Sequence, residues 1–190
     1  MKLGLSTGVQ ISNAATYVTS KVKILEVADI SGQQLSHMKS PCDIGVELKI
    51  DIGREFTPTM VLWGDFKRDN QGNVVGWGGA FVLRDFLTKV GYKGELGENN
   101  SLTPEIIAFL NNKEFIRLSY LSGIKEGGRY RYSDWNQVAS VEEGATGLVQ
   151  RFRHSVEQGY PRNYHPELVN NDGTSFPSVT TPLGEIATFK

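Results

Sequence analysis

The chain has 190 residues, of which 39% are hydrophobic and 22% are charged, and its formal net charge is −1. These proportions are typical of a soluble globular domain, and the near-zero charge excludes a histone-like, strongly basic nucleic-acid binder. Cys42 is the single cysteine, which excludes an internal disulfide and a multi-cysteine zinc site. No stretch approaches the roughly 18 apolar residues of a membrane helix, and the N-terminus lacks the apolar run of a secretory signal. We therefore expect a cytoplasmic protein without membrane association.

The N-terminal part of the chain predicts an arm followed by two strands. Residues 1–20 are rich in Ser, Thr, Gly and Asn and show no period, so we expect an N-terminal arm. Residues 21–30, KVKILEVADI, predict a first strand. Residues 43–52, DIGVELKIDI, alternate apolar and polar side chains, which indicates a strand buried on one face and wet on the other.

A third strand and two helices are expected next. The strand covers 59–69, TMVLWGDFKRD, with Gly64 marking a bulge or a bend. Residues 74–79 then lead into a helix over 81–90, which has apolar residues at helical spacing and a glycine directly after it. A second helix is expected over 103–112, because Thr and Pro at its start are typical of an N-cap and a first helical position.

A hairpin over 113–140, KEFIRLSYLSGIKEGGRYRYSDWNQVAS, is the most informative stretch. Its first strand, 115–121, alternates, which places Tyr120 in the core with Ile and Leu. The glycines of 122–128 suit a tight reversal. The return strand, 129–135, interleaves tyrosines and arginines. Arginines are rare in a buried strand, and large aromatic rings are uncommon in a fully solvated one. A surface that stacks bases and neutralises phosphates contains both residue types.

The C-terminal part predicts a third helix over 142–158 and an extended tail over 159–190, which is rich in Pro, Gly, Asn, Ser and Thr. Together the elements predict a mainly β (α+β) protein: an OB-like, five-stranded antiparallel Greek-key barrel over 21–158, with helices inserted at about 81–112.

The block from Cys42 to Ser140 resembles the phage-encoded single-stranded-DNA-binding proteins with an OB-fold. The resemblance covers roughly half the chain and rests on the strand pair DIGVELKIDIGREF and MVLWGDFKRD, the helix AFVLRDFLTKVGY and the closing pair FIRLSYLSGIKEGGRYRYSDWNQV. It implies a non-enzymatic protein that coats single strands during replication or recombination in the host cytoplasm. Such proteins often end in an acidic tail that recruits partners, whereas this chain ends in GEIATFK, which puts that mode of recruitment in doubt.

The residues from the aromatic and cationic stretches form the predicted nucleic-acid-binding surface. The rings would stack on bases, and the cations would contact phosphates without sequence preference. We expect Arg129, Arg131 and Lys67 to contact the DNA backbone. The full set is Trp63, Lys67, Arg68, Trp77, Arg117, Lys125, Arg129, Tyr130, Arg131, Tyr132 and Trp135.

Other chemistry has weaker support in the sequence. The three histidines and Cys42 lack metal-ligand spacing, and we predict no cofactor. Gly76 to Gly79 precede a helix but lack the residues of a phosphate-binding loop.

Glu47, Asp51 and Asp65 could approach one another, which keeps a metal-dependent nuclease or hydrolase as one alternative. A second alternative is an assembly module that uses the same rings as a subunit interface, because Tyr, Trp and Arg also anchor protein interfaces. Candidate partners are therefore single-stranded DNA, further copies of the chain, and replication or recombination proteins.

Overall fold

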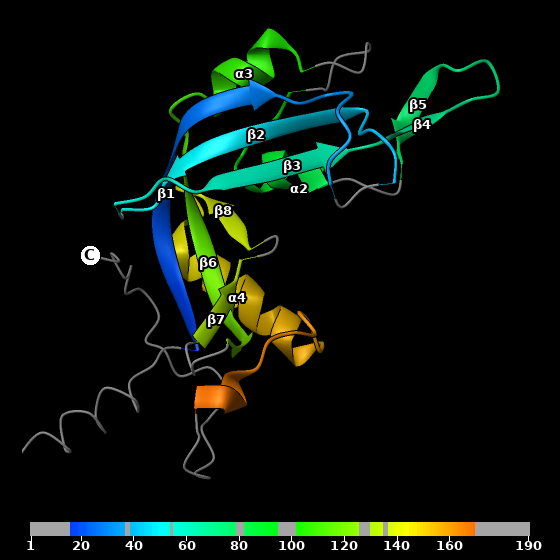
Figure 1. The fold of residues 1–190 in the computed structure, drawn as a ribbon. Helices are drawn as coiled ribbons and strands as arrows, with labels where there is room; N and C mark the ends of the chain where they lie inside the picture. The colour runs from blue at the N-terminus through cyan, green and yellow to red at the C-terminus, as the bar shows by residue number, and fades with distance from the viewer. Residues whose placement is uncertain are drawn as a thin grey trace, which may run out of the picture.

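The computed structural model describes residues 16–36, 39–53, 55–78, 82–94, 102–125, 130–134 and 137–169. Within these ranges the fold is mainly β, with antiparallel strands and a few helices (Figure 1). The principal sheet contains β1 (Tyr17–Asp29), β2 (Ile44–Asp51), β3 (Thr59–Gly64), β6 (Glu114–Ile124), β7 (Tyr130–Ser133) and β8 (Val138–Ser140). A separate hairpin joins β4 (Phe66–Arg68) to β5 (Val74–Trp77). The helices are α2 (Val82–Lys89), α3 (Pro104–Leu110), α4 (Gly144–Glu157) and the 3₁₀ helix η1 (Pro166–Val169).

Strand β1 is shared between two parts of the principal sheet, whose order is β3-β2-β1-β6-β7, with β8 also paired to β6. Its C-terminal half pairs with β2, and its N-terminal half pairs with β6. The register shifts between Ile24 and Glu26, and Figure 1 shows β1 bending where the two parts meet. We call β1–β2–β3 the upper half-sheet and β1–β6–β7–β8 the lower half-sheet.

Each half-sheet has its own apolar cluster. The upper cluster contains Val46 and Leu48 of β2 and Phe86 of α2, whose ring meets Phe115 edge to face at 5.3 Å. The lower cluster lies between β6 and α4, where the ring of Phe152 is 5.6–5.7 Å from those of Tyr17 and Tyr120. Tyr120 is 1% exposed, which confirms its predicted place in the core.

Most predicted elements are confirmed. The strands expected over 21–30, 43–52 and 115–121 correspond to β1, β2 and β6, and that over 129–135 corresponds to β7 among the described residues. The three helices are present, and the hydroxyl of the predicted cap Thr103 accepts a hydrogen bond from the Ile106 amide at 3.3 Å. The confirmed fold is therefore an antiparallel, mainly β protein with helices between the third and fourth long strands.

The strand predicted over 59–69 is interrupted where Gly64 marked a bulge or a bend, and it forms two strands in place of one. The first ends at Gly64, and the chain re-enters extended structure at Phe66 as the first strand of the β4–β5 hairpin. The stretch 74–79, interpreted as a lead-in to a helix, contains β5. The short strand β8 was not predicted. Among the described residues no ladder joins β3 to β7 or β8, so the paired strands do not close a barrel.

The ends of the predicted domain differ from the expected arm and tail in the described part. β1 begins at Tyr17, within the segment expected as an arm. Residues 160–169 pack on the lower half-sheet: the amide of His165 donates to the Leu121 carbonyl at 2.9 Å, and Tyr120 shares a hydrogen bond with Asn163 at 3.0 Å. Residues 1–15 and 170–190 lie outside the described residues.

Candidate nucleic-acid interface

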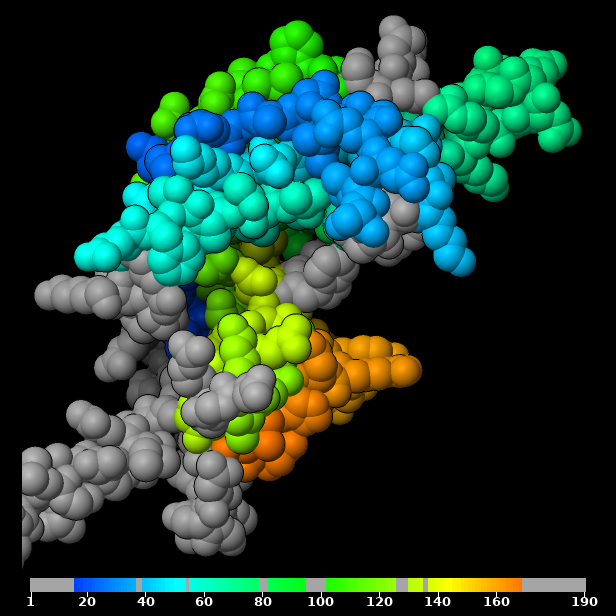
Figure 2. Space-filling view, in the orientation of Figure 1, coloured from blue at the N-terminus to red at the C-terminus, as the bar shows by residue number. Residues whose placement is uncertain are grey.

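A cleft of about 320 Å³ separates the edge strand β3 from the lower half-sheet. Figure 2 shows the surface hollowed between the blue to teal strands above and the yellow-green segment of β7 and β8 below. One wall comes from β2, β3 and the loop before it, the other from β6 to β8, and α2 contributes two apolar side chains. The lining residues are Ile50, Pro58, Thr59, Met60, Val61, Leu62, Val82, Phe86, Arg117, Asp134 and Val138.

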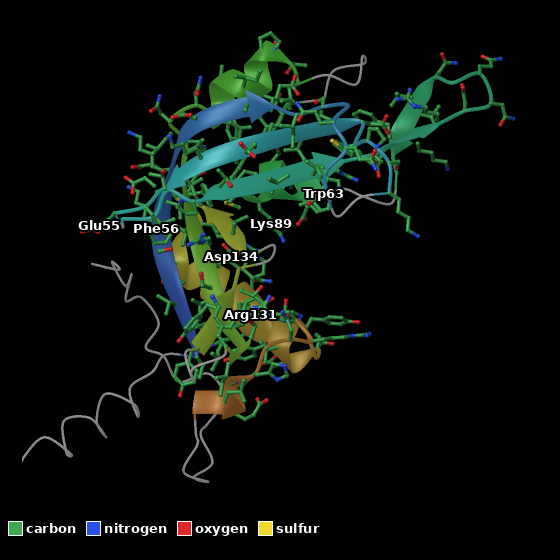
Figure 3. All side chains as sticks on the ribbon, in the orientation of Figure 1. Glu55, Phe56, Trp63, Lys89, Arg131 and Asp134 are labelled. Carbon is green, nitrogen blue, oxygen red and sulfur yellow. The ribbon has the colours of Figure 1, made fainter. Side chains whose placement is uncertain are left out.

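Arg117 and Asp134 form an ion pair in the wall of this cleft. Arg117 Nη1 lies 2.8 Å from Asp134 Oδ2, and the two side chains are 13% and 39% exposed. Arg117 Nε is buried and finds no hydrogen-bond acceptor within the described ranges. In Figure 3, Asp134 is seen between the upper half-sheet and Arg131. Arg117 therefore belongs to the cleft, with its charge balanced by a neighbouring carboxylate, and not to an open cationic track.

The β6–β7 hairpin presents two of the predicted rings on one face. Tyr132 pairs in register with Leu121, and Tyr130 pairs with Ile124, so alternation places both tyrosines on the same side of β7. Tyr132 is 40% exposed and Ile124 is 43% exposed. Burial of the rest of the ring raises the pKa of Tyr132, and the charge of nearby Tyr130 raises it further. The two phenols therefore form a partly exposed aromatic surface at the end of the lower half-sheet.

Two exposed cationic side chains lie on the same hairpin as this aromatic surface. Lys125, directly after β6, and Arg131, within β7, are both exposed, and neither forms an ion pair with a described carboxylate. Arg131 lies on the opposite face of β7 from the tyrosines, because it alternates with them along the strand. The rings and the guanidinium group of β7 therefore lie on opposite faces of the strand. Arg129 and Trp135 lie outside the described residues.

The β4–β5 hairpin carries three more of the predicted residues, and two of them have internal partners. The rings of Phe66 and Trp77 are 5.1 Å apart and pack against the upper cluster. Arg68 Nη2 lies 3.0 Å from Asp43 Oδ1. Lys67 is exposed and forms no ion pair with a described carboxylate. Figure 1 shows this hairpin projecting from the body at the far end of β3, away from the β6–β7 hairpin.

Trp63 stands near the end of β3, half-buried and opposite Gly45 of β2. Its face of the upper half-sheet also carries Glu47 and Lys49, and Lys49 Nζ is 2.9 Å from a carboxylate oxygen of Glu26 on β1. This face is mixed in charge. The structure thus divides the predicted residues into a group around β3 and the β4–β5 hairpin, and a group on β6 and β7.

Sequence reasoning missed one residue of this region. Asp134 lines the cleft and pairs with Arg117, but no local pattern signals which carboxylate a strand residue will meet across a sheet.

The described residues bring together no group of three His, Cys, Asp or Glu side chains that could hold a metal. Glu47 and Asp51 are exposed on β2, whereas Asp65 lies between β3 and β4. Cys42 is buried, and that burial raises the pKa of its thiol. His37 and Gly79 lie outside the described residues. The carboxylates of the hydrolase alternative therefore gain no support from their placement.

No protein-family model matches this chain, and no curated protein or solved structure is significantly similar to it. None of the helices in the described ranges has the length and apolar character needed to span a bilayer.

Proposed function

We propose that the protein binds single-stranded DNA without a general sequence requirement, and that the β6–β7 hairpin is its principal contact. The observation that carries the proposal is that one hairpin holds a partly exposed tyrosine pair on one face of β7 and two exposed cations, Lys125 and Arg131. Rings that stack on bases and cations that meet phosphates are the two components of a single-strand platform. The phage-type role in replication or recombination remains part of this proposal.

The strand order supports an OB-like interpretation of the fold. With the β4–β5 hairpin set aside as an insertion, β1, β2, β3, β6 and β7 follow the five-strand order of an OB-fold, with helices between the third and fourth strands. OB-folds are partly open barrels, and they bind oligonucleotides at the connections after their first and fourth strands. The β6–β7 hairpin is the connection after the fourth strand of this order, so the rings and cations lie where such folds make contact.

Affinity for oligo-dT tests the proposal directly. The full chain is titrated at low salt against a labelled strand of about 15 nucleotides, a length at the upper end of OB-fold site sizes. Fluorescence anisotropy is expected to rise with saturable binding. Lys125→Ala/Arg131→Ala is expected to weaken it and to reduce the slope of log K against log salt by about 1.4, the contribution of two phosphate contacts on a single strand.

Lys23→Ala/Lys93→Ala is the matched control. It removes the same charge from two exposed lysines, one on β1 and one after α2, that form no ion pair with a described carboxylate. Its slope is expected to stay close to that of the wild type. Absence of saturable binding by the wild type, or equal slopes for the two double variants, would reject the proposal.

An assembly module remains the second candidate, because the described surface also exposes apolar side chains beside unpaired strand edges. Val75 of the β4–β5 hairpin is 56% exposed, and β3 is an edge strand of the principal sheet. Edge strands can pair with a second chain. Sedimentation at several salt concentrations separates the two candidates, because an apolar subunit interface hardly responds to salt, whereas DNA binding weakens steeply.

A further inference from the structure

The cleft between β3 and the lower half-sheet combines apolar walls with one pair of opposite charges. Met60 of β3 and Val82 and Phe86 of α2 supply apolar surface, while Arg117 and Asp134 are the charged residues of the lining. Apolar pockets with a few convergent polar groups are the usual form of small-ligand sites, and about 320 Å³ lies at the lower end of their size range. A space of this size suits one planar ring with its sugar, and it excludes a run of stacked bases.

The hydrogen-bonding capacity of the ion pair is only partly used. Asp134 Oδ2 lies 2.8 Å from Arg117 Nη1, whereas Arg117 Nε is buried without an acceptor among the described residues. No described group donates to the other carboxylate oxygen of Asp134. A guanidinium group has five N–H donors in a fixed plane, and a carboxylate has two acceptor oxygens. The cleft therefore has a guanidinium group and a carboxylate side by side in its wall.

We propose that this cleft binds a guanine base. Guanine presents two adjacent donors, N2–H and N1–H, followed by the acceptor O6. The donors match the Asp134 carboxylate, and O6 matches the Arg117 guanidinium, while the apolar side chains contact the ring faces. Adenine, cytosine and thymine each present a single donor group on this edge, so they leave one carboxylate oxygen unmatched. The inference adds a base preference to the proposed function and depends on it only for the source of the base, an unpaired strand.

Mononucleotides test the cleft separately from the β6–β7 hairpin. The full chain is titrated calorimetrically with dGMP, dAMP, dCMP and dTMP at one salt concentration. We expect dGMP to bind at least about tenfold more tightly than the other three, the discrimination typical of a matched bidentate contact. Equal affinities, or no binding of dGMP, would overturn the inference.

Two variants locate the preference. Asp134→Asn removes the second acceptor and is expected to lower dGMP affinity to that of the other nucleotides. Glu143→Gln is the control, because it makes a similar change in an ion pair that does not line the cleft. Glu143 lies 3.0 Å from Nη2 of Arg151. This variant is expected to keep the wild-type preference for dGMP. Val82→Phe keeps the charged pair and fills the cleft, so dGMP binding should be lost. An unchanged dGMP preference in Asp134→Asn or in Val82→Phe would contradict the inference.

Parallel anisotropy with oligo-dT makes the two failures distinguishable. If oligo-dT binds through the β6–β7 hairpin and dGMP shows no preference, the guanine cleft is wrong and the proposed function stands. If dGMP binds with the expected preference and oligo-dT does not bind, the cleft stands and the strand-coating function is wrong.

Discussion

The β4–β5 and β6–β7 hairpins both combine aromatic rings with cationic side chains, but the two hairpins differ in how far those side chains contact the rest of the protein. In β4–β5, Phe66 and Trp77 pack on each other and on the upper cluster, and Arg68 pairs with Asp43. In β6–β7, Tyr132 is 40% exposed and Arg131 has no described carboxylate within ion-pairing distance.

The difference teaches that alternating aromatic and cationic residues mark a binding surface only where the fold leaves their side chains exposed to a ligand. The same residue types stabilise the hairpin when a core and a carboxylate lie within reach. Substitutions in β4–β5 should therefore change the free energy of unfolding, and substitutions in β6–β7 should change affinity for DNA.

Trp77→Ala is expected to have the largest effect. The indole is half-buried against Phe66 and the upper cluster, so its removal should lower the free energy of unfolding by about 2 to 3 kcal/mol, less than for a fully buried ring. Urea denaturation followed by circular dichroism measures the loss. The oligo-dT affinity of the folded variant should stay close to that of the wild type. A large loss of affinity at unchanged stability would contradict a purely structural role of the β4–β5 hairpin.

Tyr130→Ala/Tyr132→Ala is expected to lower the affinity for DNA more than the free energy of unfolding. Losing two stacking contacts at the lower limit of about 1 kcal/mol each weakens oligo-dT binding by about 30-fold. Anisotropy at low salt measures the change, and Tyr130→Phe/Tyr132→Phe is the matched control because it keeps both rings. Equal affinity of the alanine and phenylalanine variants would show that the rings do not contact bases.

Asp43 and Arg68 allow a graded test of how the β4–β5 hairpin is anchored. Asp43 accepts from the Phe66 amide at 2.8 Å and from Arg68, so Asp43→Ala should cost about 1–2 kcal/mol of stability. Arg68→Ala removes a partly exposed ion pair and the 3.3 Å contact of Nη1 with the Gly72 carbonyl, and should cost less than about 1 kcal/mol. Urea midpoints in the opposite order would contradict the anchoring role of the Phe66 contact.

Cys42, next to this anchor, gives the smallest expected effect. Burial raises the pKa of its thiol in the folded protein, so the unfolded chain loses the proton first as pH rises. Its contribution to stability is therefore complete below the ordinary thiol pKa of about 8.5 and falls as pH rises above it. Urea denaturation at neutral and alkaline pH should show a smaller alkaline loss for Cys42→Ala than for the wild type. An equal loss in both would indicate that the thiol does not contribute.

Local periodicity was sufficient to predict most of the fold. The alternation over 43–52 and 115–121 marks strands with one buried face, and Thr103, Pro104 and Gly91 mark helix ends through backbone chemistry that acts within a few residues. Gly91 indeed follows α2 with a φ of 92°. Gly64 marked the bend at which β3 ends. The pairing of β4 with β5 could not be predicted, because the partner of a strand depends on contacts outside the strand itself.

The site was predictable in residue type but not in arrangement. The tyrosines of β7 share one face, as alternation requires. The pairing of Arg117 with Asp134 and of Arg68 with Asp43 depends on which strands become neighbours, and no spacing in the sequence encodes it. The cleft between β3 and the lower half-sheet likewise exists only once β1 has bent to serve both halves.

Hydrogen–deuterium exchange of the full chain, with and without saturating oligo-dT, compares the two hairpins in one measurement. The account predicts slower exchange of backbone amides at the end of β6 and in β7 when the strand is bound, and unchanged exchange in β4 and β5. Protection confined to β4 and β5, or no protection in β7, would contradict it.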